Sequence, residues 1–238
     1  MPLFVWILAA AVTAGAAMVQ GTVGVGFAMV SVPILALLDP ALAPAPQILI
    51  AVPLTVAMMI RERDAMDLSG VWWIIIGRLP GAFVGVLLLG LASARLLDAL
   101  IGLIVLGAVI TIATGYHLTR TRTTEFLAGM ASGTTGVVGS IGGPPVALIY
   151  TGDESDTIRS TLAAVFTFGA LTSIAFRLAG GHLSLNDLKV ALVLLPAAGA
   201  GLWVATLTRD RVPRRVVRAA ILVVCAVAAT TLLLRAVL

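Results

Sequence analysis

The sequence predicts an all-α polytopic integral membrane protein built from two inverted structural repeats. Three observations predict this fold: an apolar composition, apolar runs long enough to span a bilayer, and a glycine-rich break that occurs twice. Of the 238 residues, 60% are hydrophobic and 11% are charged, whereas about a quarter of the residues in a soluble domain are charged. So much apolar surface cannot be buried inside a water-soluble globule. We therefore expect a lipid bilayer to surround most of the chain.

Charged residues and turn residues divide the chain into eight apolar blocks. Most blocks suit one helix, because about 20 residues cross the roughly 30 Å of hydrocarbon in a bilayer. The blocks comprise residues 3–38, 40–60, 68–94, 99–116, 126–150, 160–176, 188–207 and 219–234.

Two of these blocks do not suit a single crossing. Residues 3–38 would form a helix of about 54 Å at 1.5 Å per residue, which is too long for one crossing. Residues 126–150 are interrupted repeatedly by glycine from Gly129 to Gly143, and each glycine costs about 1 kcal/mol in a helix interior. We expect each block to be a hairpin of two helices with a glycine motif at its tip. Three transmembrane helices then follow each hairpin.

One constant shift in residue number aligns the two halves of the chain. A shift of 116 positions places Gly26 on Gly142, and it aligns other special residues in the same way. These further pairs are Arg61 with Arg177, Leu79-Pro80 with Leu195-Pro196, Gly85 with Gly201, and Arg95 with Arg211. The sequence therefore predicts a first repeat over residues 1–116 and a second over 117–238, within a single membrane domain. Interrupted apolar segments at corresponding positions of two halves are typical of a transporter binding site.

The basic residues test the hairpin interpretation. If each hairpin returns to the side from which it entered, one side of the membrane carries ten arginines and the other carries four basic residues. Such a bias is typical of the cytoplasmic side, so we expect both termini outside the cytoplasm and the chain in the cytoplasmic (inner) membrane. Each half then crosses an odd number of times, which inverts the second half relative to the first. The ten arginines are Arg61, Arg63, Arg120, Arg122, Arg159, Arg209, Arg211, Arg214, Arg215 and Arg218.

Composition also argues against several classes of partner. The net charge of +4 comes from arginines between apolar runs, so we expect no nucleic-acid partner. The single cysteine, Cys225, and the two histidines, His117 and His182, are far apart in the sequence, so we expect no metal site, and we expect no cofactor. The sequence leaves the oligomeric state open, a homodimer included.

The two glycine tips are the first candidates for a substrate-binding site. Irregular backbone at membrane depth is tolerated only where it is buried in protein or lines a cavity. A helix that begins at such a tip presents unpaired N–H groups and a positive dipole end, which favour an anion. The candidate residues in the tips are Gln20, Gly21, Thr22, Gly24, Gly26, Ser140, Gly142, Gly143 and Pro144.

Three arginines within or at the ends of apolar blocks are the next candidates. Arg78 lies well inside an apolar block, where a charged side chain is costly and predicts a functional site. Its guanidinium suits an oxyanion, because it offers several donors in one plane. Arg61 and Arg177 occupy corresponding positions at segment ends, where they could guard the mouths of the cavity or anchor the helices at the interface.

The chain resembles the sulfite exporter TauE/SafE family, also called the TSUP family of membrane anion transporters. The resemblance rests on Gly24-Val25-Gly26 followed by Pro33, on Ser140 to Pro145, and on the Leu-Pro-x-x-x-x-Gly pattern at Leu79–Gly85 and Leu195–Gly201. It implies secondary transport of a small sulfur oxyanion or organosulfonate, such as sulfite, sulfoacetate or thiosulfate. It also assigns the family's glycine-motif positions to Gly24, Gly26, Gly142 and Gly143.

We therefore expect a transporter that moves a small anion by alternating access, as an exporter, with proton coupling left open. A passive anion channel is an alternative. An intramembrane serine hydrolase is another, with Ser140 as nucleophile. The hydrolase hypothesis has no general base for Ser140. A serine nucleophile needs a base within hydrogen-bond reach, and both histidines lie near segment ends. We expect no enzymatic activity.

Overall fold

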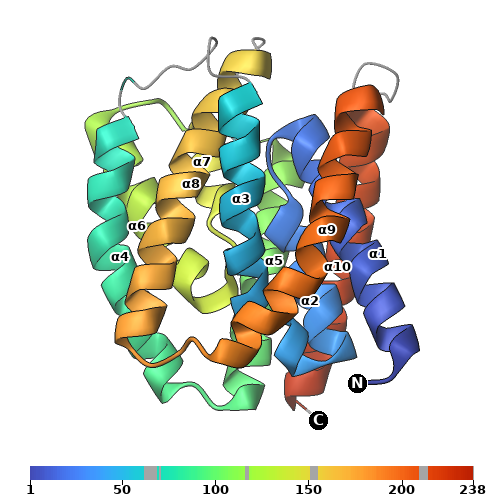
Figure 1. Cartoon of the computed structure of the whole chain (residues 1–238). Coiled ribbons are helices and arrows are strands. Elements are labelled where there is room, and N and C mark those ends of the chain that lie inside the picture. Colours follow the sequence, from blue (N-terminus) through green and yellow to red (C-terminus); the bar gives the residue numbers. More distant parts are fainter. Residues whose placement is uncertain (62–68, 70, 116–117, 151–154, 209–213, 238) are drawn as a thin grey trace.

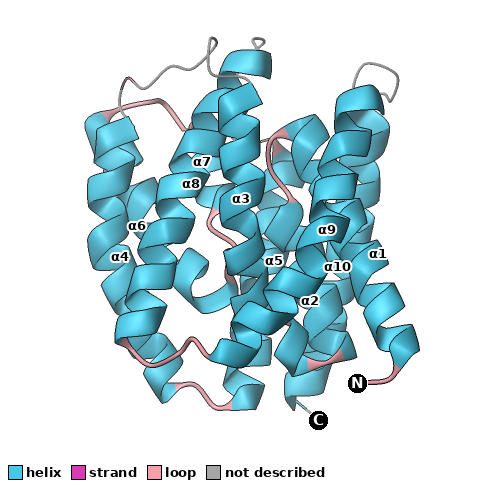
Figure 2. Ribbon diagram, in the orientation of Figure 1, coloured by secondary structure: helices cyan, strands magenta, loops and turns pink. Residues whose placement is uncertain are grey.

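The computed structural model of the chain describes all residues except 62–68, 70, 116–117, 151–154, 209–213 and 238. The described residues form ten α-helices and one short 3-10 turn, with no strand among them (Figure 2). The elements are α1 (Leu3–Val23), α2 (Phe27–Leu38), η1 (Pro40–Leu42), α3 (Ala45–Arg61), α4 (Val71–Leu91), α5 (Ala94–Thr114), α6 (Arg122–Gly139), α7 (Gly143–Ala147), α8 (Ser155–Ala179), α9 (Leu185–Thr208) and α10 (Arg214–Val237).

Seven segments of the described chain are long and apolar enough to cross a membrane. They lie at 3–23, 40–61, 71–91, 94–114, 157–179, 185–208 and 219–237. Many large apolar side chains on these helices are exposed, Trp72 and Leu91 among them, as expected for surfaces that face lipid. The prediction of an all-α polytopic membrane protein is confirmed.

Each half of the chain contains a pair of helices with a break between them, followed by three long helices. The pairs are α1–α2 and α6–α7. The predicted boundary between the repeats, at residues 116–117, lies outside the described residues. Figure 1 shows both termini at the same end of the bundle. The inversion of one half relative to the other stays a prediction.

Contacts between helices correspond when the two halves are exchanged. The first helix of each half packs against the fourth helix of the other, as α1 with α9 and α6 with α4. The third helices, α3 and α8, pack against each other, and so do the last helices, α5 and α10. The shift of 116 residues that aligns the sequences therefore also aligns the helix pairings.

The first break depends on glycine. Gly24 and Gly26 have φ angles of +90° and +128°, a region that side chains rarely adopt. The chain leaves α1 at Gly24, and α2 begins after Gly26. The second break is different, because its positive φ of 59° belongs to Ser140. Gly142 lies there in a right-handed conformation with φ −89°, so the sequence motif did not predict which residue makes that turn.

Close contact between α4 and α6 also requires glycine. A Cβ atom at Gly77 or Gly81 of α4 would collide with a backbone carbonyl of α6, at Phe126 and Met130 respectively. Conversely, a Cβ at Gly129 would collide with the carbonyl of Ile74 in α4. Small residues of this kind allow two membrane helices to approach until their backbones touch. This contact positions Arg78, which lies between Gly77 and Gly81.

We expect Gly81→Ala to lower the thermal unfolding temperature of the detergent-purified protein, because the carbonyl of Met130 cannot move away without shifting α6. Overpacking of this kind costs about 1–3 kcal/mol. Gly107→Ala is the matched control, because nothing lies within 4 Å of a Cβ at Gly107. The control should unfold at the wild-type temperature or above it. Equal unfolding temperatures for the two variants would contradict the close helix contact.

Candidate functional site

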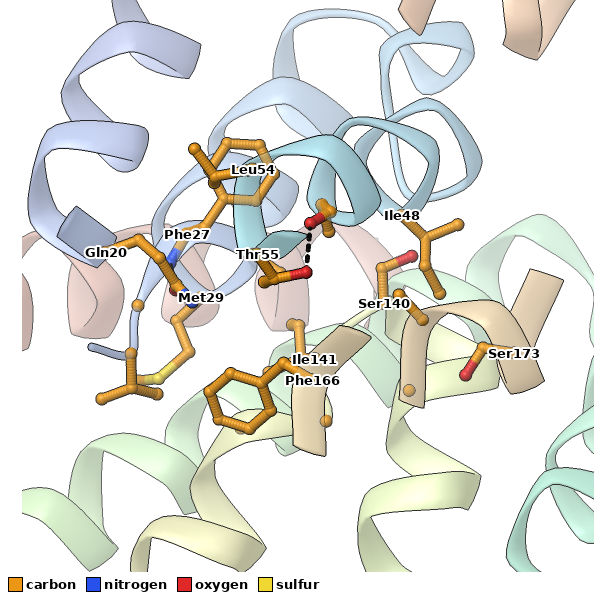
Figure 3. A pocket seen from close by; sticks show the side chains of 18 of the residues that line it. Gln20, Phe27, Met29, Ile48, Leu54, Thr55, Ser140, Ile141, Phe166 and Ser173 are labelled. Carbon is orange, nitrogen blue, oxygen red and sulfur yellow. Dashed lines mark hydrogen bonds between the residues drawn. The ribbon is translucent and has the colours of Figure 1, made fainter. Parts of the chain in front are cut away.

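Both breaks line one partly open cavity of about 60 Å³. A cavity needs at least about 10–15 Å³ of such volume to hold one water molecule, so this cavity is large enough to hold water. Figure 3 shows Gln20 and Phe27 of the first break, Ser140 and Ile141 of the second, and Ser173 of α8 around the cavity. The remaining walls come mainly from α3 and α8 and are mostly apolar.

Seven of the ten residues predicted to bind substrate line this cavity, and three do not. The seven are Gln20, Gly26, Arg78, Ser140, Gly142, Gly143 and Pro144. A Cβ at Gly21 would point at α9, and a Cβ at Gly24 would meet the side chain of Arg159. The Thr22 hydroxyl donates to the carbonyl of Val19 in its own helix, at 2.9 Å. These three residues shape the break and do not contribute to the wall of the cavity.

Arg78 is held deep inside the protein by groups from two other helices. Its side chain is only 3% exposed. Nη1 donates to the hydroxyl of Ser132 in α6. Nη2 donates to the carbonyl of Gly169 at 2.9 Å and to the hydroxyl of Ser173 at 3.4 Å, both in α8. The guanidinium is therefore fixed in one place, at the edge of the cavity.

The positive charge of Arg78 has no counter-charge in the described residues. Its three hydrogen-bond acceptors are two hydroxyls and a carbonyl, and no carboxylate of the described chain pairs with it. Its buried Nε atom has no hydrogen-bond partner there either. Arg78 is also the only charged residue among those that line the cavity. A buried cation without a charged partner is costly.

Three glycines create the space that the guanidinium occupies. A Cβ atom at Gly169 would lie 2.6 Å from Nη2 and 2.7 Å from Nη1 of Arg78. A Cβ at Gly136 would lie 3.0 Å from Nη2, and one at Gly142 would lie 3.1 Å from Nη1. The glycine motif of the second break therefore has a function beyond turning the chain, because it accommodates a large charged side chain from α4.

The residues that hold Arg78 were not predicted from the sequence. Ser132, Gly169 and Ser173 lie on α6 and α8, between 54 and 95 positions away from Arg78. The only local signal is a small residue four positions before another on α8, at Gly169 and Ser173. Such spacing is common wherever membrane helices pack closely, so it does not identify a ligand of an arginine.

The first break presents backbone donors to the cavity. The hydrogen-bond ladder of α2 begins with the N–H of Val30, which donates to the carbonyl of Gly26 at 3.0 Å. The N–H groups of Ala28 and Met29 therefore have no acceptor within the helix, and both residues line the cavity. Gln20 Oε1 accepts the N–H of Phe27 at 2.9 Å. This contact fixes the side-chain amide at the cavity wall with its NH₂ group still available as a donor.

The second break offers fewer donors than the first. The helix that follows it, α7, has only five residues and begins Gly143-Pro144-Pro145, so its dipole is small and two of its N–H groups are missing. The hydroxyl of Ser140 donates to the carbonyl of Pro44 at 2.8 Å. Its proton is therefore used within the protein, and only its oxygen remains available at the cavity.

Arg61 and Arg177 do not line the cavity. Arg177 is 2% exposed, and its Nε and Nη2 donate to the carbonyls of Val137 and Val138 at 2.7 and 3.0 Å. Arg61 donates through Nη2 to the carbonyl of Gly21 at 3.3 Å. Each arginine therefore reaches the helix that ends at a break. The role of the two arginines at the cavity mouths stays a prediction.

Metal ligands do not cluster in the described part of the chain, where no group of three or more His, Cys, Asp or Glu side chains could hold an ion. Cys225 is buried, and its Sγ donates to the carbonyl of Met29 at 3.3 Å. The donors around the cavity are thus one guanidinium, one side-chain amide and backbone N–H groups. Groups of this kind are the ones that bind oxyanions in proteins by charge and hydrogen bonds.

Comparison with known proteins agrees with this chemistry. A family model described as "Sulfite exporter TauE/SafE" matches residues 7–232. No curated protein and no solved structure gives a significant match. The match covers almost the whole chain, from the middle of α1 to the last turns of α10. The chain belongs to the sulfite exporter TauE/SafE family.

Proposed function

We propose that this protein is a secondary transporter that carries a small sulfur oxyanion or organosulfonate across the cytoplasmic membrane by alternating access. Its family supports transport of an anion such as sulfite through a membrane. The observation that carries the proposal is the buried guanidinium of Arg78, which faces a cavity between two helix breaks and has no carboxylate partner in the described chain.

The charge of Arg78 explains why an anion would bind here. Leaving a buried charge without its partner typically costs about 3–5 kcal/mol, and the three neutral acceptors of Arg78 compensate only part of that cost. A bound oxyanion would supply the missing negative charge. It would also accept from the free N–H groups of Ala28 and Met29, because the N-terminus of α2 has a positive dipole end.

The size of the cavity favours the smallest substrates of the proposed class. Sulfite consists of four heavy atoms and is smaller than sulfoacetate or taurine, and the cavity is small, at about 60 Å³. We therefore propose sulfite as the substrate. Export is the proposed direction, because the family is described as one of exporters.

The elements that line the cavity suggest how alternating access would work. Both breaks contribute to its wall, and so do α3 and α8, which pack against each other. A rocking motion of one half against the other would open the cavity first to one side and then to the other. A hydrogen bond of 2.9 Å between Thr167 and Thr55 joins α8 to α3 next to the cavity. That contact would break if the two helices separated.

We expect Arg78→Ala to abolish the stabilisation of the detergent-purified protein by sulfite. A ligand that binds only the folded state raises the unfolding temperature by mass action. Removing one partner of a buried charge pair costs about 2–5 kcal/mol, so the affinity should fall by at least about thirtyfold. Arg95→Ala is the matched control, because it removes the same charge at an exposed site. The measurement is unfolding temperature against a concentration series of sulfite, thiosulfate, sulfate, sulfoacetate and taurine.

If a folded Arg78→Ala protein binds sulfite with wild-type affinity, the cavity beside Arg78 is not the binding site. A wild-type protein that binds sulfite but carries it through liposomes as an unsaturable current would favour the channel alternative. Saturable uptake of sulfite by the wild type that is lost in Arg78→Ala would support the transporter.

We expect Gly169→Ala to weaken sulfite binding by about tenfold or more, because the added methyl group overlaps the guanidinium of Arg78 and overpacking costs about 1–3 kcal/mol. Gly199→Ala is the control, since nothing lies within 4 Å of a Cβ at Gly199 in the same bundle. Titration calorimetry with sulfite measures both affinities. Wild-type affinity in Gly169→Ala would show that the observed position of the guanidinium is not needed for binding.

A further inference from the structure

Arg61 and Arg177 donate to corresponding carbonyls in the two halves of the chain. Arg61 donates through Nη2 to the carbonyl of Gly21, and Arg177 donates through Nε to the carbonyl of Val137. Both arginines and both acceptors are separated by 116 positions, the shift that relates the halves. The donor residue and the acceptor residue therefore both have the same position in each half, which is not expected of a chance surface contact.

The acceptors are the groups that a broken helix leaves unpaired. The last four carbonyls of an α-helix have no donor within the helix. Gly21 belongs to the last turn of α1, which ends at Val23, and Val137 belongs to the last turn of α6, which ends at Gly139. An arginine satisfies such a carbonyl and places its positive charge at the negative end of the helix dipole. Each arginine thus stabilises a helix end inside the protein.

Each contact also joins two walls of the cavity. Arg61 lies in the last turn of α3, and Arg177 lies in the last turn of α8. Thr55 of α3 and Ser173 of α8 line the cavity, as do the breaks that follow α1 and α6. Movement of a break relative to its neighbouring helix would therefore change the shape of the cavity.

The cavity itself differs between the halves, whereas the arginine contacts do not. Arg78 corresponds to Leu194, and Gln20 corresponds to Gly136. The groups that face the cavity have thus become different, while the contact at each helix end has stayed the same. This difference indicates that both breaks need the same support even though they carry different binding groups.

We propose that Arg61 and Arg177 are a matched pair of positioning residues, each of which clamps one broken helix against the helix that forms the adjacent cavity wall. The proposal rests on the function proposed above, because it assigns to this cavity the binding of the transported anion. Neither arginine touches the anion. Both act through the position of the breaks. Arg61 determines where the N–H groups at the start of α2 lie, and Arg177 determines where the glycines around Arg78 lie.

The single cysteine of the chain provides a reporter for the first break. Cys225 of α10 is fully buried, and its Sγ donates to the carbonyl of Met29 in α2. A membrane-permeant maleimide reacts with this thiol only when α2 and α10 separate. The labelling rate of Cys225 therefore measures how firmly the helix after the first break is held, without any substitution near the cavity.

The experiment measures the labelling rate of Cys225 and the affinity for sulfite in five proteins: wild type, Arg61→Ala, Arg61→Lys, Arg177→Ala and Arg95→Ala. We expect Arg61→Ala to accelerate labelling by about tenfold, because a hydrogen bond from a charged donor is lost, and to weaken sulfite binding. Arg61→Lys, which keeps a charged donor, should recover part of both effects. Arg177→Ala should weaken sulfite binding and leave the labelling rate within about twofold of wild type. Arg95→Ala should change neither.

Wild-type labelling and wild-type affinity in a folded Arg61→Ala protein would overturn the proposal, as would equal acceleration in Arg61→Ala and Arg95→Ala. If Arg61→Ala does not fold, the same two measurements on Arg61→Lys test the proposal. Lysine cannot reproduce the guanidinium geometry, so labelling faster than in the wild type and weaker sulfite binding are still expected. If wild-type protein binds no sulfite, the proposed function has failed. The labelling rates then still decide whether Arg61 holds the first break.

Discussion

The cost of keeping one guanidinium inside a membrane protein shapes much of this structure. Arg78 needs acceptors, so Ser132 and Ser173 present hydroxyls to it and Gly169 presents a carbonyl. It needs space, which requires glycine wherever another helix would place a side chain against it. It also needs negative charge, which no described residue supplies. The first two needs are met by the fold, and the third is left for a ligand.

The breaks in the helices leave backbone N–H and carbonyl groups without hydrogen-bond partners. The ends of α1 and α6 face away from water, so their last carbonyls require donors. Arginines of α3 and α8 provide these donors. The free N–H groups at the start of α2 remain unpaired at the cavity, where an anion can accept from them. One kind of unpaired group is thus satisfied by the protein, and the other is available to a substrate.

Sequence analysis predicted the membrane class, the broken helices and Arg78, because each depends on local pattern: apolar run length, glycine clusters, and a charge inside an apolar segment. It did not predict Ser132, Gly169 or Ser173, because these residues meet Arg78 only after α4, α6 and α8 pack together. It placed Arg61 and Arg177 at segment ends, as guards of the cavity mouths or as interfacial anchors, because a charge at a segment end commonly faces the interface. Which carbonyl an arginine reaches depends on tertiary packing, so the sequence pattern gave no information on it.

The two halves contribute different groups to the cavity, at positions that correspond under the shift of 116 residues. In the first half, Ala28 and Met29 offer N–H groups to the cavity, whereas the corresponding residues of the second half are Pro144 and Pro145, which have none. Arg78 lies on the side of the second break, where those donors are missing, and its counterpart is the apolar Leu194. The donors therefore come from α2 on one side and from Arg78 on the other. Both of these elements belong to the first half, whereas Ser132, Gly169 and Ser173 of the second half hold Arg78 in place. A rearrangement of the halves would therefore change the position of Arg78 relative to α2.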